Sequence, residues 1–126
     1  MNYIDSEGNR VRAKQKRRSL QGVKFTTWGR DVVDCNSFEV EAGTTGYQGG
    51  DTGHGGRTYF RIEDTWGTDI IINVIKNKNS TLKNNPAAAR GVEIMLGGDA
   101  ELTTFIEALK WAVNVLEAQS AEEGIG

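Results

Sequence analysis

The sequence has only one cysteine, one proline and one histidine among its 126 residues. The single Cys35 excludes an intrachain disulfide framework of the kind that stabilises small secreted domains. There is no run of 18 apolar residues, and the first residues lack the charged-then-apolar pattern of a secretion signal. We therefore expect a soluble protein of the reducing cytoplasm.

The composition is that of a globular protein, with 37% hydrophobic and 25% charged residues. This length predicts one domain over residues 1–126, large enough to bury a single core. Residues 1–20 are expected to form a basic N-terminal arm or a hairpin around the turn-forming residues 5–9. Residues 121–126 are expected to be a frayed tail.

Charge is unevenly distributed although the net charge is only −2. Residues 1–30 carry eight basic groups against two acidic ones, and the other 96 residues carry seven basic groups against fifteen acidic ones. A basic arm on an acidic body is typical of a protein with an anionic partner or a docking arm. The alternative, that this segment is a solvated strand, stays open.

Alternating apolar residues predict several strands. The run at 70–75 is apolar except for Asn73, which predicts a strand covered on both faces. Residues 77–86 are polar and predict a loop. The predicted strands lie near residues 23–28, 38–42, 57–62, 70–75 and 92–96.

One long helix is predicted from Asp99, which is a good N-cap residue. The order of strands followed by a helix indicates an α+β fold, an antiparallel sheet with one long C-terminal amphipathic helix packed on a face. Ala108, Trp111 and Val115 are predicted to pack against another subunit or another element, with a subunit favoured, because they lie opposite the apolar stripe. That stripe, predicted to face the core, comprises Leu102, Phe105, Ile106, Leu109, Val113 and Leu116.

The most unusual segment spans residues 43–57, in which seven of fifteen residues are glycine. Glycines let backbone N–H groups approach and converge on an anion, and Arg57 suits phosphate. Thr45 and Thr58 add hydroxyl groups, while Tyr47 and His54 offer flat surfaces for a nucleobase. The pattern lacks the Gly-Lys-Ser/Thr of a phosphate-binding P-loop. A long connection without a ligand is the alternative, although loops of this length are usually functional or disordered.

Little in the sequence predicts catalysis. His54 has no second metal ligand at a suitable spacing, and Cys35 lacks a neighbouring group that would lower the pKa of its thiol. We therefore expect no catalytic residue, no metal and no cofactor, and a phosphodiesterase that uses His54 remains an alternative.

Two stretches, residues 40–47 and 50–62, resemble the Thoeris anti-defence 1 family of phage proteins, as does the ending at 93–99 with 105–109. The resemblance covers roughly residues 37–118. It implies a protein that sequesters cyclic ADP-ribose isomers, immune signals of the infected bacterial host, in the cytoplasm without cleaving them. It also implies separate sites for cyclic trinucleotides in some members, and assembly of dimers into hexamers.

The resemblance implies that Arg57 contacts a phosphate, with Gly55, Gly56 and Thr58 around it. Family members also use an aromatic group and polar side chains from a later segment. Here the corresponding residues 82–90 contain no aromatic residue and supply only polar groups such as Arg90. The aromatic partner of the base therefore stays open among Tyr47, Trp28 and Trp66.

Two further functions remain open. The first is a nucleic-acid-binding module that uses the basic first thirty residues, with Phe25 and Trp28 among them, and its affinity would fall steeply with salt. The acidic remainder of the chain makes nucleic acid the less favoured partner, and no membrane partner is expected. The second is an inhibitor that binds a host protein.

Overall fold

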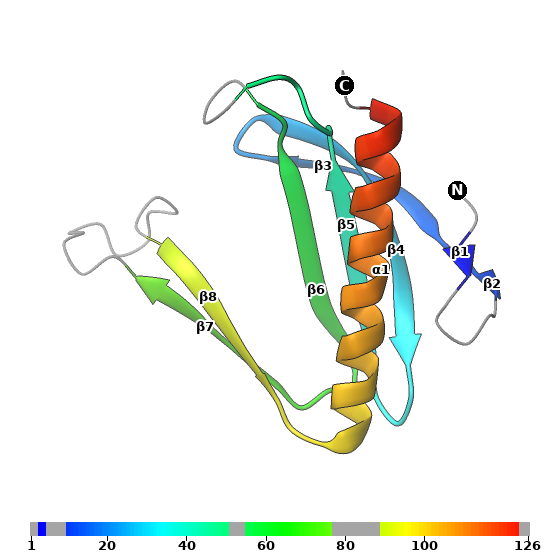
Figure 1. Ribbon diagram of the computed structural model, residues 1–126. Helices are drawn as coiled ribbons and strands as arrows, with labels where there is room; N and C mark the ends of the chain where they lie inside the picture. The colour runs from blue at the N-terminus through cyan, green and yellow to red at the C-terminus, as the bar shows by residue number, and fades with distance from the viewer. Residues whose placement is uncertain (1–2, 5–9, 51–54, 77–88, 124–126) are drawn as a thin grey trace.

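Eight strands precede a single long helix in the described part of this computed structural model, which comprises residues 3–4, 10–50, 55–76 and 89–123 (Figure 1). Strand β1 (Tyr3–Ile4) pairs antiparallel with β2 (Arg10–Val11). The segments on either side of residues 5–9 therefore pair as a hairpin, one of the two arrangements predicted for the N-terminal arm.

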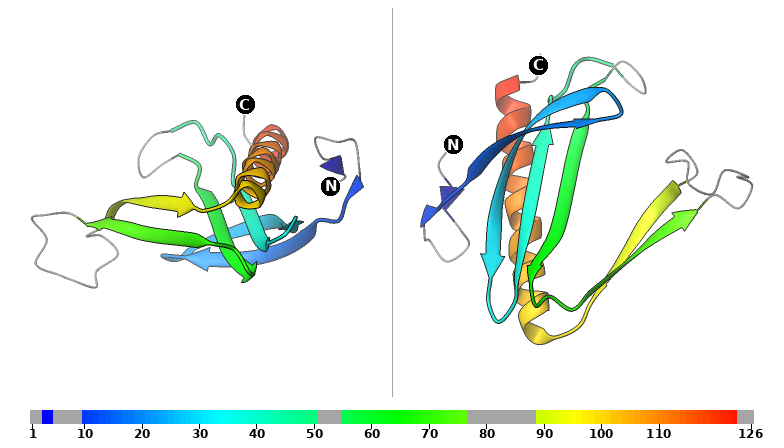
Figure 2. Two further views of the ribbon diagram at one scale, coloured as in Figure 1. Left: turned by 90° about the horizontal axis from the view of Figure 1, so that it is seen from below. Right: turned by 180° about the vertical axis from the view of Figure 1, so that it is seen from behind.

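The central sheet has four antiparallel strands in the order β3, β4, β5 and β6. Helix α1 (Asp99–Glu123) lies across β5 and β4 on one face of this sheet (Figure 2). The predicted α+β fold, an antiparallel sheet with a C-terminal helix on one face, is confirmed. The four strands are β3 (Lys14–Leu20), β4 (Val23–Val33), β5 (Ser37–Thr44) and β6 (Thr58–Trp66).

The hydrophobic core lies between α1 and the sheet. Alternation along β5 turns Phe38, Val40 and Ala42 toward the helix, and all three are at most 1% exposed. The helix contributes Trp111 and Val115 to the same core. This single-sided core is what the alternating pattern of β5 predicted.

The predicted orientation of α1 is wrong. Ala108, Trp111 and Val115 were predicted to pack against another subunit or another element, and they are buried against the sheet of the same chain, which is the less favoured of the two. Side-chain size and hydrogen bonding determine which face of the helix packs on the sheet. Alanines let the helix approach the sheet closely, and Trp111 Nε1 donates a hydrogen bond to the Trp28 carbonyl at 3.2 Å. Four members of the predicted core stripe are exposed instead: Leu102, Ile106, Leu109 and Val113.

The opposite face of the sheet combines a buried charged cluster with the ring pair of Phe25 and Tyr59. Glu41 is fully buried there, and Arg18 donates to both of its carboxylate oxygens at 2.7 and 2.8 Å. Thr27 donates a third hydrogen bond at 2.7 Å. Gly43 permits the close passage of β4, because a Cβ at this position would meet the Thr26 carbonyl oxygen at 2.5 Å.

The buried carboxyl of Glu41 has a lowered pKa. Its burial raises the pKa, but the hydrogen bonds from Arg18 and Thr27 and the charges of Arg18 and Lys16 lower it by more. The pKa of Glu41 therefore lies below the ordinary glutamate value, and the group is a charged part of the fold.

Strands β7 (Ile70–Lys76) and β8 (Ala89–Leu96) form a separate two-stranded hairpin that projects from the body of the molecule (Figures 1 and 2). The strand at 70–75 was predicted to be covered on both faces. This prediction is wrong, because no described element of the same chain covers β7. Ile72 and Val74 are each 51% exposed, since among the described elements β7 pairs only with β8.

Two further boundaries differ from expectation. Strand β4 continues to Val33, beyond the predicted end near residues 28–29, because β5 pairs with its second half. Helix α1 continues to Glu123 and so extends into the predicted tail at 121–126. The predicted loop at 77–86 and residues 124–126 lie outside the described residues.

Candidate functional site

The glycine-rich segment is closed at its base by hydrogen bonds between β5 and β6. The Thr45 N–H donates to the Arg57 carbonyl at 3.0 Å, and the Arg57 N–H donates to Thr45 Oγ1 at 2.9 Å. The hydroxyls of Thr44 and Thr58 lie 3.0 Å apart across the same pair of strands. These bonds fix both ends of the segment on the rigid sheet, which is the usual way to position a binding loop.

Glycine is required at particular points of this segment. Gly46 and Gly49 both have a φ of 78°, which side chains disfavour. A Cβ at Gly56 would overlap the Gly46 carbonyl oxygen, so the two arms of the segment approach more closely than any other residue would allow. The described part of the segment therefore has a defined conformation.

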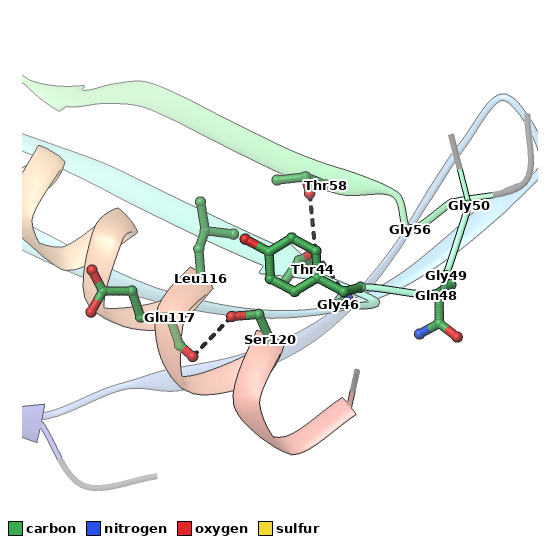
Figure 3. Close-up of a pocket in the computed structure, with 11 residues that line it drawn as sticks. Thr44, Gly46, Gln48, Gly49, Gly50, Gly56, Thr58, Leu116, Glu117 and Ser120 are labelled. Atoms are coloured by element: carbon green, nitrogen blue, oxygen red, sulfur yellow. Dashed lines mark hydrogen bonds between the residues drawn. The ribbon is translucent and has the colours of Figure 1, made fainter. Parts of the chain in front are cut away.

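A cavity of about 600 Å³ lies between this segment and the C-terminal part of α1 (Figure 3). Its volume suits a mononucleotide-sized or somewhat larger ligand. Tyr47 is 77% exposed, so its ring is available to a ligand. The lining residues are Thr44, Gly46, Tyr47, Gln48, Gly49, Gly50, Gly56, Thr58, Leu116, Glu117 and Ser120.

Gln119 fixes the end of the helix against the loop. Its side-chain amide accepts a hydrogen bond from the Thr44 N–H at 2.7 Å and donates one to the Thr26 carbonyl at 3.0 Å. The side chain of Gln119 is 1% exposed, so both bonds are shielded from water. As a result, the neighbouring residues Leu116, Glu117 and Ser120 line the cavity opposite the glycines.

The two walls of the cavity differ in chemistry. The loop wall consists of threonine side chains and glycine backbone, a lining that occurs in anion sites, and its Gly46 N–H donates to Thr44 Oγ1 at 3.1 Å. The helix wall includes Glu117, whose carboxylate extends away from the glycine-rich segment (Figure 3). Acidic side chains accept hydrogen bonds from ribose hydroxyl groups in dinucleotide-binding proteins. A ligand with a phosphate at one end and a sugar diol at the other matches both walls.

Arg57 lies at the base of the loop and not among the residues that line the cavity. Its guanidinium Nη1 donates to the carbonyls of Gly55 and Gly56 at 3.2 and 3.4 Å. Within the described residues its guanidinium forms no salt bridge with a carboxylate. The charge of Arg57 is therefore not neutralised by any described acidic group.

The structure brings together some of the residues predicted for the site and separates others. Tyr47, Gly56 and Thr58 line the cavity, while Gly55, Thr45 and Arg57 lie beside it in the loop base. Arg90 lies on β8, in the projecting hairpin, and does not reach the cavity of its own chain (Figure 1). His54 lies outside the described residues.

The sequence did not predict the contribution of α1 to the site. Leu116 was assigned to the core, whereas Gln48, Glu117 and Ser120 were not singled out. Their proximity depends on the two hydrogen bonds of Gln119 to strands more than 70 residues earlier. A polar residue on the buried face of an amphipathic helix was the available signal.

Three of the four basic residues of β3, all except Arg17, form salt bridges with acidic residues of β4 and β5. Lys16 Nζ lies 3.2 Å from the Glu39 carboxylate, and Arg18 Nε lies 2.7 Å from that of Glu41. Lys14 forms a longer pair with Asp31 at 3.7 Å. Three of the eight basic residues in the first thirty are thus paired within the fold.

Other chemistry was sought in the described part of the chain. There, no group of three or more histidine, cysteine or acidic side chains could hold a metal ion. Cys35 is exposed at the turn between β4 and β5. The described helix is not long and apolar enough to cross a membrane.

Comparison of the chain with protein-family models, with curated proteins and with solved structures found no match.

Proposed function

We propose that this protein binds a small anionic nucleotide in stoichiometric amounts and withholds it without chemical change. The observation that carries the proposal is the cavity of about 600 Å³ between the glycine-rich segment and α1. Its loop wall suits phosphate, and Glu117 on its helix wall suits ribose hydroxyls.

Because the loop resembles that of the Thoeris anti-defence 1 family, we propose more specifically that this is a phage anti-defence protein. In that case the ligand is a cyclic ADP-ribose isomer made by the infected host, and cyclic trinucleotides are further candidates. Such ligands combine phosphates, ribose diols and a base, which are the groups that the two walls and Tyr47 would contact. The protein would act in the host cytoplasm as a homo-oligomer, dimeric or hexameric.

Tyr47 is the aromatic side chain that the cavity favours as the partner of the base. It lines the cavity, whereas Trp28 and Trp66 do not. Stacking on an aromatic ring contributes about 1–3 kcal/mol per base. Replacing Tyr47 with alanine is therefore expected to weaken binding roughly 5- to 150-fold.

Isothermal titration calorimetry with purified cyclic ADP-ribose isomers and cyclic trinucleotides tests the proposal. Wild-type protein should bind one of these ligands with a defined stoichiometry, and Tyr47→Ala should bind it more weakly. Trp66→Ala is the matched control, because Trp66 is similarly exposed (70%) but lies outside the cavity. The absence of heat for every ligand would count against the proposal.

The fate of the ligand separates sequestration from catalysis. Mass spectrometry of the nucleotide released by heating the complex should show the intact ring. An opened product would instead indicate a phosphodiesterase. Loss of that product in the His54→Ala variant would identify His54 as its catalytic acid or base. The pairing of Lys16 and Arg18 with carboxylates disfavours another alternative, a nucleic-acid-binding module.

A further inference from the structure

Strand β6 forms one edge of the four-stranded sheet. Within the described residues it pairs only with β5, so one alternating set of its backbone N–H and C=O groups points away from the sheet. The next strand, β7, leaves the body after residues 67–69 and pairs with β8 instead (Figure 1). The outer side of β6 is therefore open to a further strand.

The other edge strand of the sheet, β3, is protected by charge. Four of its seven residues are basic, and such side chains on an edge strand discourage pairing with another chain. Residues 58–62 of β6 contain only one charged side chain, that of Arg61. Of the two edges, β6 is therefore the one suited to a partner strand.

The helix side of β6 is apolar. Phe60 and Ile62 point to this side, because they are in register with buried residues of β5 that face α1. Ile62 and Phe105 both pack against the core, and Leu109 follows Phe105 by one helical turn. Phe60 and Leu109 remain 45% and 43% exposed. A strand added beside β6 places every second side chain on this side, where aliphatic groups match Phe60 and Leu109.

The opposite side of β6 carries arginine donors for a carboxylate. Arg61 Nη2 donates to Glu63, whereas the buried Nε of Arg61 has no hydrogen-bond partner in the described part of the chain. The Arg61 side chain is 39% exposed, and a guanidinium has more donors than one carboxylate uses. Arg57, which directly precedes β6, forms no salt bridge with any described carboxylate. Acidic side chains on this side of an added strand are therefore the electrostatic complement of β6.

We propose that an extended segment of a partner protein, with alternating aliphatic and acidic side chains, pairs with residues 58–62 as a further strand of this sheet. Main-chain hydrogen bonds to β6 supply the affinity, and the alternate side chains supply specificity through Phe60 on one side and Arg61 on the other. Neither of these residues lines the nucleotide cavity, so the pairing and the proposed function are tested separately.

Fluorescence anisotropy with a labelled synthetic peptide tests the pairing on the full chain. The probe alternates three glutamates with three valines, and the control has the same residues as a block of glutamates followed by a block of valines. The alternating peptide should bind at least about tenfold more tightly, because only its strand presents one aliphatic and one acidic side. Equal affinities, or no saturation by the alternating peptide at millimolar concentration, would overturn the proposal.

Backbone methylation distinguishes strand pairing from contact between side chains alone. N-methyl groups on the valines remove the amide donors along one edge of the peptide, and N-methyl groups on the glutamates remove those along its other edge. Only the peptide that is methylated on the edge facing β6 should lose binding, by about tenfold or more. Equal binding of the two methylated peptides would overturn the main-chain pairing.

Substitutions on the two edge strands locate the site. Phe60→Lys should weaken binding of the alternating peptide about tenfold, because it places a charge against the aliphatic side of the added strand. Leu20→Lys is the matched control, since Leu20 is similarly exposed (57%) but lies on the other edge strand. Equal affinities of the two variants would overturn the assignment to β6.

The preference for acidic side chains has its own test. A peptide of alternating lysines and valines should bind the wild-type chain at least about tenfold more weakly than the glutamate peptide. Arg61→Gln, which removes the charge but keeps amide donors, should reduce this difference. Equal binding of both peptides to the wild-type chain, or an unchanged difference in Arg61→Gln, would overturn the acidic chemistry of the partner.

Sedimentation equilibrium without peptide tests whether a second copy of the chain occupies the same edge. The mass of the wild-type protein should equal that of Phe60→Lys, whatever its oligomeric state. A wild-type oligomer that dissociates in Phe60→Lys but not in Leu20→Lys would assign β6 to contacts between copies and overturn the proposed partner segment.

Discussion

The two faces of helix α1 show that the large aliphatic side chains of this helix are not the ones that are buried most fully. Beside Trp111 and Val115, the face on the sheet contains alanines and the polar residues Thr104 and Gln119, whereas the face away from it contains leucine, isoleucine and valine. Close approach to the sheet and hydrogen bonds to strand backbones determine which residues of α1 face the sheet. The outer face retains large aliphatic side chains, which is typical of a surface made for a partner.

The largest expected effect concerns the inner face. Trp111→Ala should lower the free energy of unfolding by about 3–5 kcal/mol, because Trp111 is 3% exposed and its removal leaves a cavity. Urea denaturation followed by circular dichroism measures this loss. Leu109→Ala, at 43% exposure on the outer face, should cost less than about 1 kcal/mol at concentrations where the chain is monomeric. Equal losses at both positions would contradict the assigned orientation.

A smaller loss of stability is expected from a change at the junction of α1 with the glycine-rich segment. Gln119→Leu should destabilise the fold by about 1–3 kcal/mol, since it leaves the Thr44 N–H and the Thr26 carbonyl without their partner. Amide hydrogen exchange should become faster at Thr44 and the neighbouring loop glycines. Ser120→Ala removes only a local bond to the Glu117 carbonyl and should leave exchange at Thr44 unchanged.

The charged face of the sheet predicts an acid-sensitive fold. The folded pKa of Glu41 lies below its value in the unfolded chain, so its contribution is complete above about pH 4.3 and is lost as pH falls through the folded pKa. Urea denaturation between pH 6 and pH 3 should show this decline. Glu41→Gln should be less stable near neutral pH and less sensitive to acid, and an unchanged pH dependence would rule out this role for Glu41.

The smallest expected change in stability is in the hairpin. Val74→Lys should alter the unfolding free energy of the monomer by less than about 0.5 kcal/mol, because Val74 is 51% exposed. The same substitution should weaken the proposed homo-oligomer if the hairpin face lies in a contact between copies. Sedimentation at several protein concentrations separates these two effects.

Local sequence patterns were sufficient for most of the elements. The alternation along β5 and the helical spacing after Asp99 predicted both the sheet and its helix. They did not predict which face of α1 is buried, since Ala112 and Gln119 gain their role only from contacts with distant strands. The loop half of the candidate site was predicted from its glycines, and the helix half required the fold.

The most direct test of the proposed nucleotide site is a ¹H–¹⁵N NMR titration of the full chain with a cyclic ADP-ribose isomer. Amide shifts should concentrate at Gly46, Gly49, Gly56, Glu117 and Ser120, which lie on both walls of the cavity. Shifts confined to the basic strand β3, or no shifts at millimolar ligand, would contradict the account.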